Sequence, residues 1–358
     1  MQSGNNSLQS RRELLMRAGA GAAAITFGGA SFAEGAKGQK SGIILGSGEH
    51  KYECIHDWLT PPDDILWGDT QGLCQDSAGR IYVSHTVHSG SKKNNAIVVF
   101  DKHGKYLSSW GEEFAGGGHG IEVRREGAVD GEGGEEFLYH CDTNHRKVVK
   151  TTLTGKIIWE KTTPLEPGVY DSKHAFVPTN VAFSPNGDFY ISDGYGSNYI
   201  HQYNIDGNWI RTFGGTGSEG GKFRCSHGIT VDHRGKEPLL LVTDRSNSRN
   251  QYLSLDGKFI SFQNEKMRLP SYFSFRKDVM AVADLTAVVT LVDPKGHVIA
   301  MLGDGVPDAE PLRDHPRKDF IPGKFVHPHS VRFLQNGDIL VAEWVPIGRV
   351  TLLKKLRA

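Results

Sequence analysis

The sequence predicts an all-β protein, a six-bladed β-propeller, and three observations lead to that fold. Strand-like runs such as "AIVVF", "DFYISD" and "LLLVTD" recur between Gly, Asn and Asp turns, whereas stretches with helical periodicity are hard to find. Glycine is abundant, with 44 residues in a chain of 358. The strand pattern repeats every 45 to 61 residues, which suits blades of four strands.

The N-terminal segment is expected to be a targeting signal. The motif "SRRELLM" precedes the apolar run "AGAGAAAITFGGASFA", and the pair Arg11 and Arg12 is typical of the twin-arginine type. We expect residues 1–33 to form this signal and residues 34–50 a linker, so that the mature chain is periplasmic or extracellular. An ordinary signal or an uncleaved anchor is the alternative, but the run is short and glycine-rich for a bilayer span.

Residues 51–358 are expected to form the propeller, and each blade is expected to begin with a short inner strand. The six inner strands start at "QGLCQD" (Gln71), "HGIEV" (His119), "NVAF" (Asn180), "HGITVD" (His227), "YFSF" (Tyr272) and "HSVRF" (His329). A second strand follows each inner strand, and five of these end in an acid, namely Asp142, Asp193, Asp244, Asp284 and Glu343. The second strand of the first unit, "IYVSH", ends instead in His85.

The last unit offers only three strands, the third being "GRVTLLKKL". We expect the segment 51–59, "KYECIHDWL", to supply its fourth strand, because that pairing closes the ring and removes an exposed edge. Two long insertions, 124–136 and 304–321, are expected to be loops.

The charge balance argues against a nucleic-acid partner. Lys and Arg together number 41, as do Asp and Glu, so no net field would attract nucleic acid or an acidic membrane. We expect a monomer without a membrane span in the mature chain, which binds a small-molecule or peptide substrate at the mouth of the propeller channel.

The four cysteines leave two alternatives open. Cys54, Cys74, Cys141 and Cys225 could form two disulfides in an oxidising compartment, or they could remain buried thiols. None has the C-x-x-C spacing of a zinc site.

Histidines open three of the inner strands, in blades two, four and six. Alternate blades of a sixfold ring are about 120° apart, so His119, His227 and His329 can converge on the axis. Three neutral histidines with one open position are typical of a catalytic zinc site. The alternative is that these side chains only form hydrogen bonds with water in the channel.

Two further polar residues are predicted to lie at the same mouth. Tyr195 in "SDGYG" and Arg245 in "TDRSN" follow second strands, and a second strand ends where the inner strand of its blade begins. We expect both to face the histidines. The alternatives are a tyrosine that packs in a glycine-rich turn and an arginine that pairs with Asp244.

The motifs "GGKFRCSHGITVD" and "NGDFYISDGYGSNYIHQYN" resemble NHL repeats, the blade type of certain six-bladed propellers. The ordered succession "HGI", "SDGYGSN", "HGITV", "TDRSNSR" and "PHSV" resembles the lyase part of the peptidylglycine alpha-amidating enzymes over nearly all of the mature chain. This resemblance implies that His119, His227 and His329 bind Zn²⁺, and that Tyr195 and Arg245 serve catalysis.

The resemblance also implies a reaction, the breakdown of a peptidyl alpha-hydroxyglycine to a peptide amide and glyoxylate. The substrate hydroxyl must lose a proton while the C–N bond breaks, and metal coordination would lower the pKa of that hydroxyl. Tyr195 could be the general base if a nearby cation lowers its own pKa from about 10. Arg245 is the candidate cation because it is permanently charged.

The chain departs from the resembled lyase at three places. The family's Ca²⁺ site uses two backbone carbonyls, matching Leu73 and Ile121, and an acid directly after the third histidine, where this chain has Ser330. A second family arginine falls near Thr86. Gly196 replaces the cysteine beside the family's tyrosine. A structural calcium and the mode of substrate carboxylate binding are therefore in question.

Two other functions are weighed against the lyase. A non-catalytic NHL propeller would bind a peptide, glycan or protein partner across the same mouth. A six-bladed lactone or ester hydrolase would need a calcium ion held by acids and amides, and only Asn180 and Gln71 offer amides at the ring.

Overall fold

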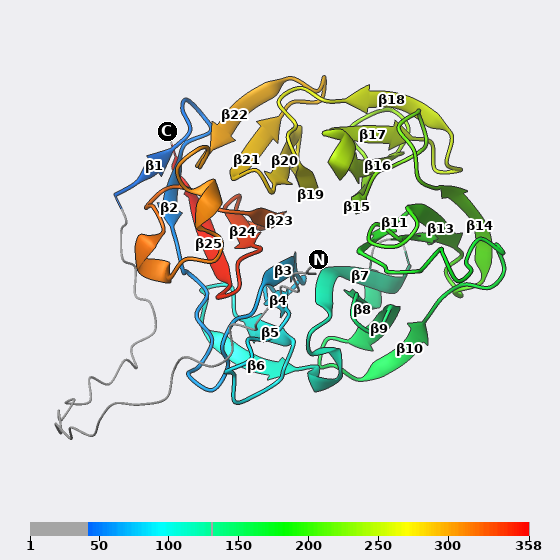
Figure 1. The fold of residues 1–358 in the computed structure, drawn as a ribbon, viewed down its shortest axis with the longest axis horizontal. Helices are drawn as coiled ribbons and strands as arrows, with labels where there is room; N and C mark the ends of the chain where they lie inside the picture. Colours follow the sequence, from blue (N-terminus) through cyan, green and yellow to red (C-terminus); the bar gives the residue numbers. More distant parts are fainter. Residues whose placement is uncertain (1–41, 130–131, 358) are drawn as a thin grey trace, which may run out of the picture. The chain divides into compact units, whose positions relative to one another are not determined.

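Six antiparallel sheets surround a central axis in the computed structural model, which describes residues 42–129 and 132–357 (Figure 1). The inner strand of each sheet lies nearest the axis, and the remaining strands follow outward. The predicted all-β, six-bladed propeller is thereby confirmed. The predicted signal, residues 1–33, lies outside the described residues, as do residues 34–41 of the predicted linker.

The blades follow one another in chain order. From the inner strand outward, blade one consists of β3 (Thr70–Gln75), β4 (Ile81–His85), β5 (Ile97–Phe100) and β6 (Tyr106–Trp110). Blade two consists of β7 (Gly118–Val129), β8 (Glu132–Asp142), β9 (Lys147–Thr152) and β10 (Ile157–Lys161). Blade three consists of β11 (Asn180–Phe183), β12 (Phe189–Ser192), β13 (Tyr199–Tyr203) and β14 (Trp209–Gly214). Blade four consists of β15 (Ser226–Asp232), β16 (Leu239–Asp244), β17 (Arg249–Leu253) and β18 (Phe259–Gln263). Blade five consists of β19 (Pro270–Arg276), β20 (Val279–Asp284), β21 (Val288–Val292) and β22 (Val298–Leu302).

The sixth blade joins the two ends of the described chain. It consists of β23 (Pro328–Phe333), β24 (Ile339–Glu343), β25 (Arg349–Lys355), β2 (Tyr52–Ile55) and β1 (Ile44–Leu45). Strand β2 pairs with β25 in antiparallel register, with Cys54 opposite Leu353. The segment predicted to close the ring therefore does so, and β1 adds a fifth strand outside it.

Each blade is tied together at the end of its second strand. In five blades the side chain at or directly after the end of that strand accepts the N–H of the residue three positions before the predicted inner-strand start, which is Gln71, Asn180, His227, Tyr272 or His329. These bonds run from Gly68 to Nδ1 of His85 (3.2 Å), Val177 to Asp193 (2.6 Å), Arg224 to Asp244 (2.7 Å), Leu269 to Asp284 (2.9 Å) and Val326 to Glu343 (2.7 Å). In blade two, Asp142 accepts the N–H of His145 instead (2.9 Å).

His85, the exception in the sequence pattern, performs the same task as the acids. Its Nε2 lies 2.9 Å from the carbonyl oxygen of Asn95 and donates to it, so Nδ1 is free to accept. Burial lowers the pKa of His85 to about 4, which keeps Nδ1 unprotonated at neutral pH. These bonds hold the segments that lead into the inner strands, and thereby the residues with which those strands begin.

The inner strands are irregular where the histidines lie. The pairing register shifts between Gly118 and Ile121 in β7, between Ser226 and Ile229 in β15, and between Pro328 and Ser330 in β23. A β-bulge bends its strand and re-aims a side chain. Each of the three histidines therefore sits in a bulge at the mouth of the channel.

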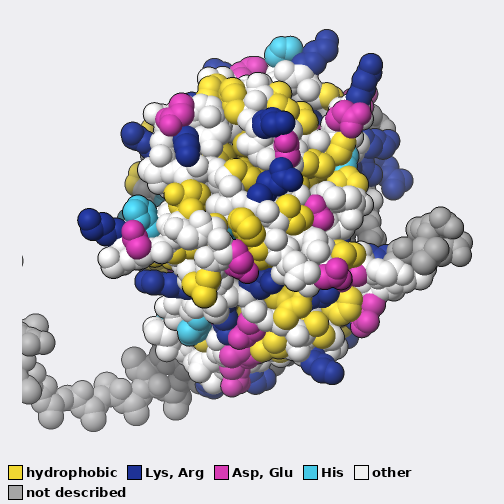
Figure 2. All heavy atoms as spheres, turned by 90° about the vertical axis from the view of Figure 1, so that its right-hand side faces the viewer, with side chains coloured by type: hydrophobic (Ala, Val, Ile, Leu, Met, Phe, Trp, Pro, Cys, Tyr) yellow, Lys and Arg dark blue, Asp and Glu magenta, His cyan; other side chains and the backbone are white. Residues whose placement is uncertain are grey.

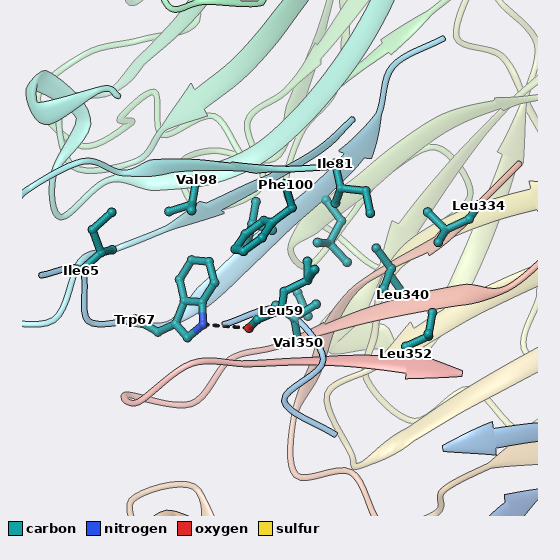
Figure 3. Close-up of a cluster of buried hydrophobic side chains, with 13 residues drawn as sticks. Leu59, Ile65, Trp67, Ile81, Val98, Phe100, Leu334, Leu340, Val350 and Leu352 are labelled. Atoms are coloured by element: carbon teal, nitrogen blue, oxygen red, sulfur yellow. Dashed lines mark hydrogen bonds between the residues drawn. The ribbon is translucent and has the colours of Figure 1, made fainter. Parts of the chain in front are cut away.

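Apolar clusters fill the spaces between neighbouring blades. The cluster in Figure 3 joins blade six to blade one, with Leu340 and Val350 on one side and Ile81 and Phe100 on the other. The indole N–H of Trp67 reaches the carbonyl oxygen of Leu59 at 3.4 Å. This burial stabilises the joint at which the ring closes.

The described residues of the insertion 124–136 pair as a long hairpin of β7 and β8, so the prediction of a loop is wrong for residues 124–129 and 132–136. Strand pairing continues through Arg125 opposite Glu136 and Ala128 opposite Gly133. Glu126 in this hairpin pairs with Lys150 at 2.6 Å. Cross-strand pairing and such ion pairs extend β7 and β8 beyond the other blades. The insertion 304–321 contains only two short 3₁₀ turns, η3 (Glu310–Leu312) and η4 (Arg317–Asp319).

One side of the described chain, shown in Figure 2, carries basic and acidic side chains interspersed, with apolar side chains scattered between them. Across residues 42–129 and 132–357, no helix has the length and apolarity that crossing a bilayer requires.

A buried histidine outside the mouth allows a prediction about stability. His140 in β8 is 2% exposed, its ring centroid lies 4.5 Å from that of Phe114, and its Nε2 has no hydrogen-bond partner. Burial lowers its pKa to about 3. We expect His140→Phe to raise the free energy of unfolding by about 1 kcal/mol at pH 7, because an unsatisfied polar atom is removed.

The gain should increase as the pH falls from 6.5. In that range the unfolded wild-type chain binds a proton at this histidine that the folded chain excludes, so only the wild type loses stability through it. Urea unfolding at pH 7 and pH 5 measures both effects, with the exposed turn residue His103→Phe as control. Equal changes in the two variants would contradict this account.

Candidate metal centre

Three imidazoles meet at one end of the channel. His119 in β7, His227 in β15 and His329 in β23 come from alternate blades and are each at most 2% exposed. One ring nitrogen of each lies within 4.8 Å of those of the others. Residues separated by about a hundred positions in the chain therefore converge as the strand pattern predicted.

The neighbouring blade orients each imidazole. Nδ1 of His119 lies 2.7 Å from the carbonyl oxygen of Thr179, Nδ1 of His227 lies 2.9 Å from that of Ser271, and Nδ1 of His329 lies 2.7 Å from that of Gln71. A carbonyl oxygen only accepts, so each Nδ1 carries the proton and donates it. A hydrogen bond of this kind, from the ring nitrogen that does not face the metal, fixes the tautomer of a metal-binding histidine.

Glycine after the histidine permits this approach in two blades. A Cβ at Gly120 would lie 2.4 Å from the carbonyl oxygen of Thr179, and one at Gly228 would lie 2.4 Å from that of Ser271. Any other residue would push away the strand that orients the ring. This close contact accounts for the motif "HG" in blades two and four.

The Nε2 atoms of the three histidines bring three lone pairs together, an arrangement that a bound cation would stabilise. Nε2 of His119 and Nε2 of His227 are 3.2 Å apart, and Nε2 of His329 is buried without a hydrogen-bond partner. Because Nδ1 holds the proton in each ring, all three Nε2 atoms are acceptors and cannot bond to one another. A metal ion that takes three nitrogen ligands satisfies all of them, so the residues fit a zinc ion with an open position.

Burial keeps these imidazoles neutral. It lowers the pKa of His119 to about 4 and moves those of His227 and His329 well below the usual value. The Arg245 guanidinium lowers all three further. Neutral imidazole is the form that binds a metal.

Tyr195 and Arg245 lie beside the histidines. The Tyr195 hydroxyl is 3.0 Å from Nε2 of His227 and 3.3 Å from Nε2 of His119. Arg245, at the start of η2 (Arg245–Asn247), places its guanidinium carbon 5.2 Å from the centre of the Tyr195 ring. Nη1 of Arg245 is buried without a hydrogen-bond partner.

Burial of the hydroxyl raises the pKa of Tyr195, while Arg245 opposes that rise. The side chain as a whole is 42% exposed, but the pKa follows the surroundings of the hydroxyl and not the exposed part of the ring. Arg245 by itself therefore does not lower the pKa of Tyr195 below its ordinary value. A divalent cation next to the hydroxyl would act in the same direction as Arg245.

The structure adds three residues to this mouth that sequence reasoning missed. Asp69 precedes β3, Trp344 follows β24, and Arg313 comes from the insertion 304–321. Nη2 of Arg313 lies 2.9 Å from Oδ1 of Asp69, and its guanidinium carbon lies 3.8 Å from the centre of the Trp344 ring. Trp344 directly follows Glu343, the acid at the end of the second strand, as Arg245 directly follows Asp244. The same position in the blade pattern could therefore have predicted Trp344 at the mouth. No pattern pointed to Arg313.

The other blades place polar residues at the histidine position, as predicted. Gln71 and Asn180 are 7% and 5% exposed, and Oε1 of Gln71 has no hydrogen-bond partner. The hydroxyl of Tyr272 instead donates to Glu122, farther along the channel.

All four cysteines are free thiols, so the disulfide alternative is wrong. Cys54, Cys74, Cys141 and Cys225 belong to blades six, one, two and four, which keeps them apart. Burial raises the pKa of Cys54 to about 12 and raises those of Cys74 and Cys141 well above the ordinary value of a thiol. These three therefore behave as small apolar residues of the core.

Comparison with known proteins shows that the chain is similar in sequence to several alpha-amidating enzymes. No family model matches the chain. It is 27% identical over 291 residues to peptidyl-glycine alpha-amidating monooxygenase B of Xenopus laevis, covering 75% of this chain and 30% of that protein. It is 27% identical over 264 residues to peptidyl-alpha-hydroxyglycine alpha-amidating lyase 2 of Drosophila melanogaster, covering 72% of this chain and 59% of that protein.

The chain is a six-bladed propeller that resembles the alpha-amidating lyases. It spans less than two thirds of the length of the frog and fly relatives. Among solved structures, a streptogramin B lyase superimposes with a TM-score of 0.55 at 14% identity, covering 84% of this chain and 97% of that one. At that identity the match shows the propeller fold alone.

Proposed function

We propose that this lyase-like propeller is an exported, Zn²⁺-dependent lyase. It cleaves the C–N bond of a peptidyl alpha-hydroxyglycine, or of a similar carbinolamide, to an amide and glyoxylate. The observation that carries the proposal is the Tyr195 hydroxyl, 3.0 Å from Nε2 of His227 and next to the point where three imidazole lone pairs meet. The names of the frog and fly relatives support the substrate class.

Each residue of the site has its own role in the proposed reaction. A zinc ion held by His119, His227 and His329 would act as a Lewis acid on the substrate hydroxyl. Tyr195, as phenolate, takes the hydroxyl proton while the new C=O bond forms and the C–N bond breaks. The electron pair of that bond remains on nitrogen, and Tyr195 returns the proton there, which gives the amide. Arg245 stabilises the phenolate through its charge.

Glyoxylate release tests the proposal. The purified, zinc-loaded protein is incubated with a short peptide that ends in alpha-hydroxyglycine, and glyoxylate and peptide amide are measured together. Both should appear in equal amounts. A folded, metal-loaded protein that binds the peptide without releasing glyoxylate would favour the non-catalytic alternative.

We also propose that Arg313 binds the substrate carboxylate. The second arginine expected near Thr86 is absent, yet Oγ1 of Thr86 accepts the N–H of Asp69 at 3.0 Å, and Asp69 pairs with Arg313. The insertion 304–321 thus brings a guanidinium to blade one from another part of the chain. Stacking on Trp344 holds its plane in place.

Arg313→Leu is expected to raise KM for the hydroxyglycine peptide by roughly 10- to 100-fold, with a smaller effect on kcat, because a charged hydrogen bond to the substrate is lost. Steady-state kinetics measure both constants. Arg80→Leu is the control, since Arg80 forms a comparable ion pair with Asp76 at the opposite end of β3. An unchanged KM in Arg313→Leu would remove this residue from the binding site.

We further propose that residues 1–33 direct twin-arginine export and that residues 51–358 form the mature propeller together with β1 (Ile44–Leu45), which pairs with β2 from within the predicted linker 34–50. Arg11 and Arg12 support this route. Cell fractionation of the double variant Arg11→Lys, Arg12→Lys checks it, and full export of that variant would reject it.

A further inference from the structure

A second polar centre lies in the channel beyond the three histidines. Glu122 follows His119 by three residues in β7, and Arg332 follows His329 by three residues in β23. Three residues of a strand span about 10 Å, so this centre forms a separate layer along the axis. The Arg332 guanidinium forms an ion pair with Glu122, whose carboxylate also accepts the Tyr272 hydroxyl.

The same arginine holds a backbone carbonyl of a fourth blade. Nε of Arg332 donates to the carbonyl oxygen of Leu73 in β3 at 3.2 Å. Arg332 and Glu122 are only 21% and 12% exposed at their side chains. The inner strands of blades one, two, five and six are thus connected across the axis by one largely covered cation, Arg332, and one buried carboxylate, Glu122.

This centre occupies the place where the resemblance to the lyases implies calcium. One of the two expected carbonyl ligands, that of Leu73, is taken by Arg332, and the expected acid is the neutral Ser330. Calcium requires six to eight oxygen ligands at 2.3–2.6 Å. A calcium ion bound to the Leu73 carbonyl would also lie within about 6 Å of the guanidinium, and two cations repel strongly in a buried site.

We infer that the Arg332 guanidinium replaces the structural calcium of the resembled lyases. The axis of this propeller is held by the Arg332–Glu122 ion pair, and its stability does not depend on calcium. The inference is independent of the reaction at the histidine layer, because it concerns different residues and is measured without substrate.

Calcium content and thermal unfolding of the whole protein provide the first test. Elemental analysis of the purified wild type should find no stoichiometric calcium, and millimolar calcium chloride should leave its melting temperature unchanged. One tightly bound calcium per chain that raises the melting temperature would overturn the inference.

Variants of the ion pair provide the second test. Arg332→Met should lower the melting temperature by roughly 5 °C or more, because Glu122 becomes an unpaired buried charge. Adding Glu122→Gln should restore much of that loss, since no buried charge then remains. Arg276→Met is the control, because Arg276 lies at the same end of the channel outside this ion pair. Equal melting temperatures for Arg332→Met and wild type would overturn the inference.

A gain of calcium binding provides the third test. The double variant Ser330→Asp, Arg332→Met frees the Leu73 carbonyl and restores the acid, so its melting temperature should rise as calcium is added. Ser330→Asp alone, with the guanidinium still in place, should show no such rise. Calcium stabilisation of the single variant, or none in the folded double variant, would show that Arg332 does not occupy the calcium position.

Discussion

His227→Ala is expected to abolish glyoxylate release and to leave the purified protein without stoichiometric zinc. Changes in groups that only orient a metal ligand cost 10- to 100-fold in affinity, so loss of a direct ligand should weaken zinc binding by more than about 100-fold. His227 is central to the set, because its Nε2 lies 3.2 Å from that of His119 and 3.0 Å from the Tyr195 hydroxyl.

Elemental analysis and the glyoxylate assay measure the two losses separately. His140→Phe is the matched control, since His140 is equally buried but packs against Phe114 and is not one of the three histidines whose ring nitrogens converge. The control should keep both zinc and activity. Full zinc occupancy in His227→Ala would show that this imidazole is not a ligand.

Tyr195→Phe is expected to lower kcat by roughly 10²- to 10⁴-fold, because a positioned acid–base group contributes about that much to proton transfer. Zinc content and folding should remain close to wild type, since only a hydroxyl at a partly exposed ring is removed. KM should change little, because the Tyr195 phenol takes part in proton transfer in the transition state and not in substrate binding.

Steady-state kinetics with the hydroxyglycine peptide, together with elemental analysis, measure these expectations. Tyr199→Phe is the control, because Tyr199 lies in the adjoining β13 of the same blade and its ring contacts Tyr170. An unchanged kcat in Tyr195→Phe would exclude this tyrosine as the general base.

Local signals in the sequence explain why the fold and the histidine triad could be predicted. Each blade repeats the same order of inner strand, turn and second strand, and in each of the three blades that begin with His119, His227 or His329 the second strand ends in an acid. Strand alternation and turn chemistry are short-range properties, so a single sequence displays them. The topology of a blade then places strand starts at one mouth.

Contacts made by irregular segments could not be predicted in the same way. Arg313 reaches Asp69 from an insertion that has no strand pattern, and Arg332 reaches Glu122 across the channel. Whether Cys54 and Cys141 pair depends on which blades they occupy, and the ring separates them. Each of these results depends on distances between residues far apart in the chain.

The sequence by itself determined the number of blades, the strand that closes the ring and the three histidines that face one axis, because a repeated local pattern specifies repeated local structure. Only the tertiary structure decided the tautomer of each imidazole, the distance of the Tyr195 hydroxyl from the imidazoles, and the position of Arg332 as the cation that links inner strands across the channel. Those properties arise where one blade meets another, since a carbonyl of blade three or five orients a ring of blade two or four.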